Sequence, residues 1–156
     1  MVAELPQSVL FCCDHNAVRS PMAEGITKQL YGSDTYVQSA GVKSDLDIDG
    51  FCIAVCQEFG VERARHQVRT FDEMEDWGDD LSSFDLIAAV SPASQRRALE
   101  LTRVFHLDVL YWPIMDPTGL GETRDAKLAA YRQTRDQIIQ RVQDLWGEGR
   151  GFPNRQ

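Results

Sequence analysis

The sequence predicts a three-layer α/β/α fold built on a four-stranded parallel sheet. Four short apolar segments with strand character alternate along the chain with longer segments whose apolar residues recur at helical spacing. This alternation favours a parallel sheet covered by helices on both faces. The chain has 156 residues, the size of one domain, and it contains no repeat or linker-like stretch. We therefore expect residues 1–156 to form a single domain.

The first half of the chain predicts two strands and two helices. Ser8–Cys13 is a short apolar run typical of a buried strand, and Thr35–Ser39 alternates as a second strand. Pro21–Tyr31 is expected to be a helix because its apolar residues recur at every fourth position and a proline stands at its start. The spacing of apolar residues predicts another helix over Gly50–Phe59.

The second half predicts two further strands and two further helices. Phe84–Val90 and Leu107–Trp112 are apolar runs with strand character. Pro92–Val104 is predicted to be the helix between them, and Thr123–Trp146 a long amphipathic helix at the end. Ligand sites in parallel sheets lie beyond the carboxyl ends of the strands, so the loops that follow the strands are examined first for chemistry.

Composition excludes several classes of function. The chain has 24 Asp and Glu against 16 Lys and Arg, a net charge of −8, which argues against broad nucleic-acid binding. No apolar stretch is long enough for a membrane helix, so we expect no membrane partner. Four cysteines without a secretory signal indicate a reducing compartment, and we expect a cytoplasmic protein. The acidic run Asp72–Asp80 is expected to be a solvated loop with Trp77 packed against the core.

The loop after the first strand carries the residues of greatest chemical interest. Cys13–Pro21 reads CDHNAVRSP, or Cys-x5-Arg-Ser-Pro, and runs from a strand end into a helix start. Backbone N–H groups and the positive end of the helix dipole make such a loop suitable for a tetrahedral anion. Arg19 adds a guanidinium that can hold two oxygens of that anion. The same positive surroundings favour the thiolate form of Cys13, which predicts a nucleophile beside an anion site.

Several segments resemble the low-molecular-weight protein tyrosine phosphatases. VLFCCDHNAVRSPMAEG is similar to the phosphate-binding loop of that family, whose pattern is V-C-x-G-N-x-C-R-S-P-x-A-E. Val37–Val42 (VQSAGV), Phe59–Phe71 (FGVERARHQVRTF), Phe84–Val90 (FDLIAAV) and Trp112–Gly119 (WPIMDPTG) are similar to further family segments. The family also contains thioredoxin-coupled arsenate reductases.

The resemblance implies a role for each matching residue. It implies that Cys13 attacks phosphorus to form a phosphocysteine, that Arg19 holds the phosphoryl oxygens, and that Asp116 protonates the leaving group and later activates water. The substrate would be a phosphotyrosine protein or a small aryl phosphate, and inorganic phosphate would be a product. No metal and no cofactor is implied. The implied phosphoryl-binding residues are Asp14, His15, Asn16, Ala17, Val18, Arg19 and Ser20. A supporting hydrogen-bond network is implied for Asn16, Ser20, Ser39 and His66.

The chain departs from the family pattern at three places. His15 replaces the loop glycine, and Asp14 next to it puts a negative charge beside the nucleophile. We expect these two side chains to face solvent or to pair with each other. Val18 replaces the second cysteine of the loop, so no disulfide can form between two loop thiols. Thr118 and the glycine after it stand where eukaryotic members carry tyrosines, so we expect a shallower or differently lined cleft.

Two other functions stay open from the sequence. A thioredoxin-coupled arsenate reductase would need further cysteines as a relay, and Cys52 and Cys56 are the only other pair. We interpret that pair as the core face of a helix, and Cys12 as a buried core thiol on the opposite face of the first strand from Cys13. A non-catalytic phosphate-binding or phosphoprotein-binding module is the second alternative, although binding alone would require neither Cys13 nor Asp116.

Overall fold

The computed structural model describes residues 2–153, which contain a sheet of four parallel strands. The strands are β1 (Ser8–Cys13), β2 (Tyr36–Gly41), β3 (Leu86–Ala89) and β4 (Asp108–Tyr111). Their spatial order is β2-β1-β3-β4, and all three pairings are parallel. The predicted fold class is therefore confirmed.

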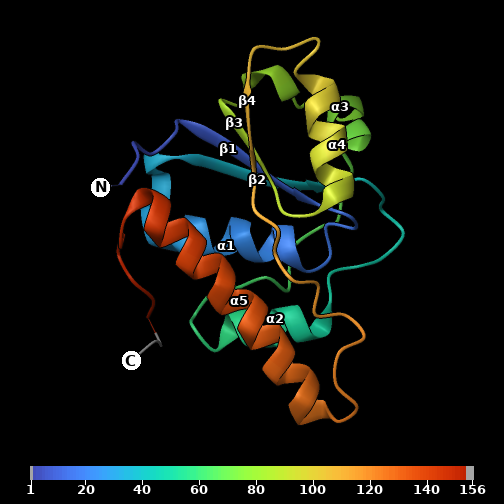
Figure 1. Cartoon of the computed structure of the whole chain (residues 1–156), viewed down its shortest axis with the longest axis vertical. Helices are drawn as coiled ribbons and strands as arrows, with labels where there is room; N and C mark the ends of the chain where they lie inside the picture. Colours follow the sequence, from blue (N-terminus) through green and yellow to red (C-terminus); the bar gives the residue numbers. More distant parts are fainter. Residues whose placement is uncertain (1, 154–156) are drawn as a thin grey trace.

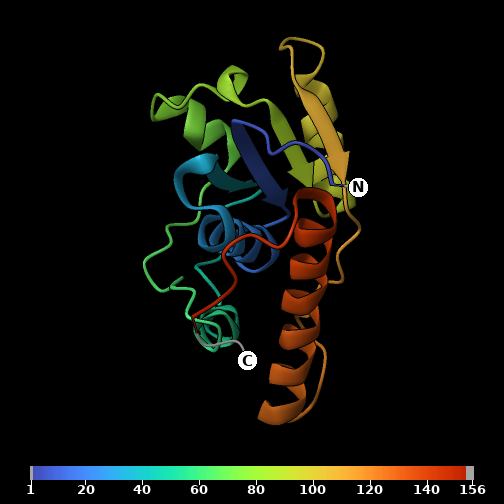
Figure 2. The same ribbon diagram turned by 90° about the vertical axis from the view of Figure 1, so that its left-hand side faces the viewer.

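Helices cover both faces of this sheet (Figures 1 and 2). One face carries α1 (Arg19–Tyr31), α2 (Gly50–Gln57) and the long α5 (Arg124–Trp146), which pack on one another. The other face carries α3 (Phe71–Asp76) and α4 (Pro92–Leu101). Two single turns of 3-10 helix, at 32–34 and 81–83, precede β2 and β3.

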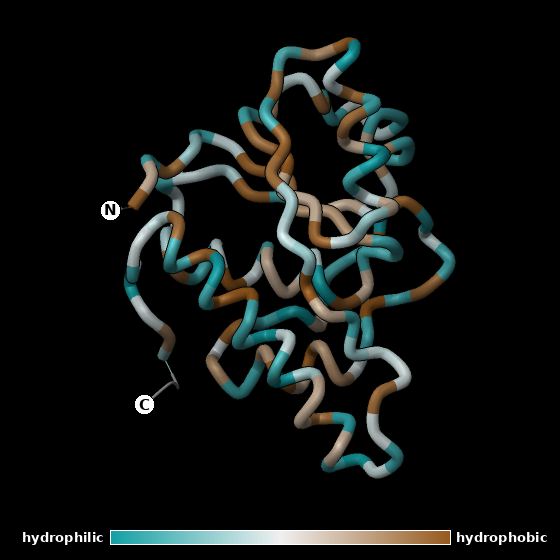
Figure 3. The backbone as a smooth tube through the Cα atoms, in the orientation of Figure 1, coloured by the Kyte–Doolittle hydropathy of each residue, from teal (hydrophilic) through white to brown (hydrophobic). Residues whose placement is uncertain are grey.

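Two apolar cores fill the spaces on either side of the sheet. Alternate residues of β1 face opposite ways, so Phe11 and Cys13 join the core under α1 and α5, whereas Leu10 and Cys12 join the core under α4. Polar and apolar residues alternate along α5, as Figure 3 shows, because only one side of this helix packs against α1, α2 and the core beneath them. In the second core, Ile87 of β3 is fully buried.

The acidic run Asp72–Asp80 does not form the predicted solvated loop. Its first part is helix α3, which begins with a capping box in which the Thr70 hydroxyl accepts from the Glu73 N–H and the Glu73 carboxylate accepts from the Thr70 N–H. Phe71 and Met74 are buried beneath it. Trp77 ends this helix with 57% of its surface exposed, so it does not pack against the core. The Thr-x-x-Glu spacing predicts this helix start, but the density of acidic residues obscured it.

Several predicted boundaries also move. Helix α1 begins at Arg19, two residues before Pro21, so the loop between β1 and α1 is shorter than predicted. Helix α4 ends at Leu101 rather than at Val104, which is strongly exposed. No helix within residues 2–153 is both long and apolar enough to cross a membrane.

The topology creates a switch point at the carboxyl ends of β1 and β3. These strands are neighbours in the middle of the sheet, but the chain leaves β1 for β2 on one side and reaches β3 and β4 on the other. The loops that follow β1 and β3 therefore run in opposite directions from the carboxyl ends of these two strands. Open parallel sheets bind their ligands in the crevice between two such loops.

Candidate active site

Cys13 is the last residue of β1, and the loop that follows leads into the amino terminus of α1. Its Sγ lies 3.0 Å from the Ser20 Oγ and accepts from the Ser20 N–H at 3.4 Å. The side chain is almost fully buried. A hydroxyl, a backbone N–H and the positive end of a helix dipole all stabilise negative charge on this sulfur.

Arg19 is the first residue of α1, and its guanidinium is fixed from behind. Its Nη1 donates to the main-chain oxygens of Val90 (3.3 Å) and Ile114 (3.0 Å), which follow β3 and β4. Its Nη2 lies 3.7 Å from the Asp14 carboxylate and 3.8 Å from the Asp116 carboxylate. The guanidinium is thus held in one plane, and one of its edges faces two carboxylates.

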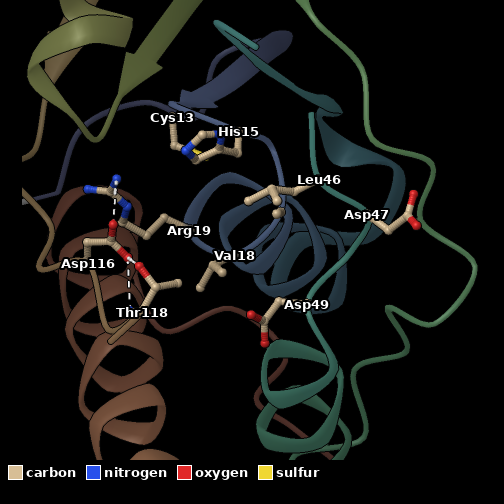
Figure 4. Close-up of a pocket in the computed structure, with 10 residues that line it drawn as sticks. Cys13, His15, Val18, Arg19, Leu46, Asp47, Asp49, Asp116 and Thr118 are labelled. Atoms are coloured by element: carbon tan, nitrogen blue, oxygen red, sulfur yellow. Dashed lines mark hydrogen bonds and ion pairs between the residues drawn. The ribbon is translucent and has the colours of Figure 1, made fainter. Parts of the chain in front are cut away.

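Asp116 lies in the loop that follows β4. Its Oδ1 accepts from the Thr118 N–H (3.0 Å) and from the Thr118 hydroxyl (2.7 Å), which fixes the carboxylate (Figure 4). Its other oxygen is the one near Arg19. The carboxylate is about half exposed, so it can exchange protons with water.

These three side chains line one cavity of about 240 Å³. Figure 4 shows Cys13 and His15 at one end, with Arg19 and Asp116 along one side. Leu46 and two aspartates of the loop after β2 line the other side, and no lining residue in the described part of the chain is aromatic. Nor do residues 2–153 contain a cluster of three or more metal-ligating side chains.

The loop is supported from behind by the buried Asn16. Its Nδ2 donates to the hydroxyls of Ser20 and Ser39, both at 2.9 Å. Its Oδ1 accepts from the Arg69 N–H at 3.1 Å and lies 2.9 Å from the His66 Nε2. The structure therefore brings together the four side chains for which the resemblance implied a network.

A buried carboxylate extends this network. The Ser39 hydroxyl donates to Glu24 Oε1 at 2.5 Å, and Lys28 donates to Glu24 Oε2 at 2.6 Å. Burial acts to raise the pKa of Glu24, but Lys28 and the Ser39 hydrogen bond outweigh it, so the pKa is lowered. Burial lowers the pKa of His66 to about 4, so this histidine is neutral at physiological pH.

Asp14 and His15 do not form the expected solvent-facing pair. Asp14 turns toward Arg19, and its Oδ1 is buried with no hydrogen-bond partner among the described residues. The Nδ1 of His15 lies 2.6 Å from Asp45 Oδ1, in the loop after β2. Asn16 has the only positive φ among the described residues other than glycine, +56°. Histidine therefore replaces the family glycine without entering the left-handed region.

The remaining cysteines are free and buried. Cys12 lies on the opposite face of β1 from Cys13, as predicted, and burial raises its pKa. Cys52 and Cys56 lie on the core face of α2, which confirms that interpretation. The Cys52 thiol lies 3.5 Å from the Val18 carbonyl oxygen, directly behind the loop.

Sequence reasoning missed residues that contact the loop from a distance. Glu24 is part of the segment that resembles the family motif, and it follows Ser20 by four residues. Residues one helical turn apart lie on the same face of a helix, so this spacing could have indicated that Glu24 belongs to the supporting network. Asp45 and the Arg69 N–H come from segments 30 and 53 residues away from their partners. No local pattern indicates those contacts.

The fold and the Cys-x5-Arg loop define an α/β protein in which a cysteine and an arginine meet at the start of the first helix. Residues 8–149 match the family described as "Low molecular weight phosphotyrosine protein phosphatase". The chain belongs to this family, as the sequence resemblance indicated.

Known proteins similar to this chain include arsenate reductases and a protein whose structure contains benzylphosphonate. The glutaredoxin arsenate reductase of Synechocystis sp. is 28% identical over 140 residues, which cover 89% of this chain and 95% of that protein. A structure titled "An arsenate reductase in the phosphate binding state" has a TM-score of 0.70 at 23% identity, covering 88% of this chain and 94% of its own. Vibrio vulnificus Wzb in complex with benzylphosphonate has a TM-score of 0.64 at 19% identity, covering 89% and 99%. Both structures have the fold described above.

Proposed function

We propose that the protein is a phosphatase that hydrolyses phosphotyrosine and related aryl phosphate monoesters through a phosphocysteine intermediate. The observation that carries this proposal is that Cys13, Arg19 and Asp116, from three separate segments, line one cavity at the amino terminus of α1. A nucleophile, an anion-binding guanidinium and a carboxyl group are the parts that this reaction needs.

In the first step the Cys13 thiolate attacks phosphorus and the bond from phosphorus to the ester oxygen breaks. Asp116 gives its proton to that oxygen, so the product leaves as a neutral phenol. Arg19 and the N–H groups of the loop hold the three phosphoryl oxygens. Nη1 of Arg19 stays on the two main-chain oxygens, which leaves Nη2 for the substrate.

In the second step water attacks the phosphorus of the phosphocysteine. Asp116, now ionised, takes a proton from that water, and the bond from phosphorus to sulfur breaks. The sulfur leaves as a thiolate, which the Ser20 hydroxyl at 3.0 Å stabilises. Inorganic phosphate is released and the starting state is restored.

Turnover of an aryl phosphate by the purified protein tests this function. We expect hydrolysis by the wild type and its loss in Cys13→Ser, because a serine hydroxyl is a far weaker nucleophile than a thiolate. Cys56→Ser, which changes a buried thiol outside the cavity, is the matched control and should keep the activity. Failure of the wild type to hydrolyse any aryl phosphate, or full activity in Cys13→Ser, would contradict the proposal.

We also propose that the chain acts as a single domain in the cytoplasm. The single sheet supports the first part, and four free thiols support a reducing compartment. The measurement is fractionation of cells that make the protein. Recovery of the protein outside the cytoplasm would contradict this assignment.

Arsenate reduction is the second candidate, because curated relatives at 25–28% identity are named arsenate reductases. Arsenate is a tetrahedral oxyanion like phosphate, so Cys13 can form an S–As bond with loss of water. A second thiol would attack the Cys13 sulfur, release arsenite and leave a disulfide, so that arsenic is reduced and two thiols are oxidised. No cysteine follows β3, so an external thiol such as glutathione is the better reductant here.

Arsenite production with arsenate and either glutathione with glutaredoxin or thioredoxin tests the second candidate. A reductase produces arsenite and hydrolyses aryl phosphate slowly, whereas the proposed phosphatase does the reverse. A protein that binds phosphate and performs neither reaction is the non-catalytic module.

A further inference from the structure

His15 lines the cavity but has no part in the mechanism above. Its ring occupies the end of the cavity where Cys13 lies (Figure 4). The family pattern places a glycine at this position, so the imidazole is a feature of this chain rather than of the family motif. About a third of the side chain is exposed, which leaves it open to a ligand.

Asp45 fixes the orientation of that ring. Its Oδ1 lies 2.6 Å from the His15 Nδ1. The pKa of Asp45 is lowered, chiefly by this hydrogen bond. An ionised carboxylate at Nδ1 requires a proton on that nitrogen and stabilises the imidazolium. The Nε2 then remains, with no partner among residues 2–153.

The loop that carries Asp45 is itself attached to the phosphate-binding loop. The Val42 N–H donates to the Asp14 carbonyl oxygen at 2.9 Å, and the Lys43 N–H donates to the same oxygen at 2.8 Å. At the other end, the Asp49 N–H donates to the Ala17 carbonyl oxygen at 3.0 Å. Asp45 is therefore held at a fixed place relative to His15 rather than on a free loop.

The balance of charge in the cavity favours a second cationic group beside Arg19. A bound phosphoryl dianion would meet the Cys13 thiolate and the Asp14 carboxylate, and among the described residues only Arg19 brings a guanidinium to the cavity lining. Asp14 also takes up part of the positive charge of Arg19, from 3.7 Å. A second cationic donor at the cavity would offset the additional negative charge that Asp14 brings.

We propose that His15 is a substrate-binding residue that donates its Nε2–H, as an imidazolium, to an oxygen of the bound tetrahedral anion. Asp45 is the positioning residue that orients the ring. The relevance of this contact to catalysis rests on the proposed function. The contact itself concerns anion binding and can be tested without turnover. It predicts that anion affinity falls as pH rises through the loss of the His15 proton.

Several other groups contribute to the field at His15. They are Cys13, Asp14 and Arg19 on its own loop, Lys43, Asp45, Asp47 and Asp49 on the loop after β2, and Asp116 after β4. The thiol of Cys13 would itself weaken anion binding when it ionises. The test therefore uses the Cys13→Ser protein as its background, and the other groups are the same in every variant compared.

The experiment measures sulfate affinity by NMR titration between about pH 5.5 and 8.5, the range in which histidines change charge. Sulfate is a tetrahedral dianion that does not titrate there. We expect the affinity of the background protein to fall by about 10-fold or more across this range, the effect of losing one charge-assisted hydrogen bond. His15→Asn and His15→Gly should bind weakly at all pH values and lose this dependence.

Two further variants complete the design. Asp45→Asn should weaken sulfate binding, because the ring loses the carboxylate that orients it. His106→Asn, which changes a histidine in a different cavity, should match the background protein. The inference is overturned if both His15 variants keep the affinity and its pH dependence, or if Asp45→Asn binds sulfate as tightly as the background protein.

This outcome is separate from that of the proposed function. Loss of the pH dependence in the His15 variants, together with no phosphatase activity in the protein that keeps Cys13, would support the anion contact and reject the reaction. Phosphatase activity in the protein that keeps Cys13, together with unchanged sulfate binding in the His15 variants, would support the reaction and reject the contact.

Discussion

The Arg19 guanidinium and the Asp116 carboxylate lie close together, and each is oriented by its own hydrogen bonds. Main-chain oxygens after β3 and β4 hold Nη1 of Arg19, so the guanidinium is oriented before any ligand arrives. Thr118 holds one oxygen of Asp116, and the other oxygen is 3.8 Å from Nη2. An anion that binds at Nη2 would come close to the Asp116 carboxyl, which is where a leaving group needs its proton.

Replacing Asp116 by asparagine tests whether this residue protonates the leaving group. Asp116→Asn cannot donate a proton, so turnover of aryl phosphates with poor leaving groups should fall by about 100- to 10,000-fold. Aryl phosphates with good leaving groups should be affected much less in the first step. The measurement is kcat/KM over a series of aryl phosphates, and an equal loss across the series would exclude the acid role.

The loop between β1 and α1 contains one residue in the left-handed region. Asn16 has a φ of +56°, and its amide makes four hydrogen bonds to side chains and backbone around the loop. Gly41 of β2 allows this arrangement, because a Cβ there would lie 2.7 Å from the Asn16 backbone nitrogen. A side chain at position 41 would therefore push the loop away from the sheet.

Two substitutions at Asn16 separate its conformation from its hydrogen bonds. Asn16→Ala and Asn16→Gly both remove the amide, and each should destabilise the protein by about 1–3 kcal/mol because buried partners are left unpaired. Asn16→Ala should lose about 1 kcal/mol more, since alanine disfavours positive φ. Urea unfolding gives both values, and equal stability of the two variants would show that the backbone conformation carries no cost.

Local patterns predicted most elements but not the contacts between loops. Apolar periodicity identified all four strands and the long helices, because burial on the sheet dictates that periodicity. Helix α3 was missed because six residues bury only Phe71 and Met74, too few for a clear period. The family motif located Cys13 and Arg19, whereas the contact of His15 with Asp45 joins residues 30 apart and depends on how two loops pack.

At the scale of the whole molecule, the buried network behind the loop couples the site to stability. His66 is neutral in the folded protein because burial lowers its pKa to about 4, whereas in the unfolded chain the pKa is 6.5. The unfolded state therefore binds more protons between these values, and stability falls as pH falls from 6.5 to about 4. The loss should reach about 2–3 kcal/mol.

Chemical unfolding at several pH values checks this dependence. His66→Gln can still donate to the Asn16 Oδ1 but does not titrate, so its stability should change much less between about pH 6.5 and 4.5. Glu24 and Glu58, whose pKa values are lowered in the folded protein, add a smaller loss near pH 4.5, where the unfolded chain begins to protonate them, and this part is the same in both proteins. A fall in stability of equal size in His66→Gln would assign the effect to other groups.

In the proposed reaction the sulfur of Cys13 becomes bonded to phosphorus during turnover. Rapid acid quenching during hydrolysis of an aryl phosphate, followed by mass spectrometry of the digested protein, measures this directly. We expect one added phosphoryl group, on the peptide that contains Cys13, and none in Cys13→Ala, which has no nucleophilic side chain at this position. Turnover with no phosphorylated peptide, or with the phosphoryl group on another residue, would contradict it.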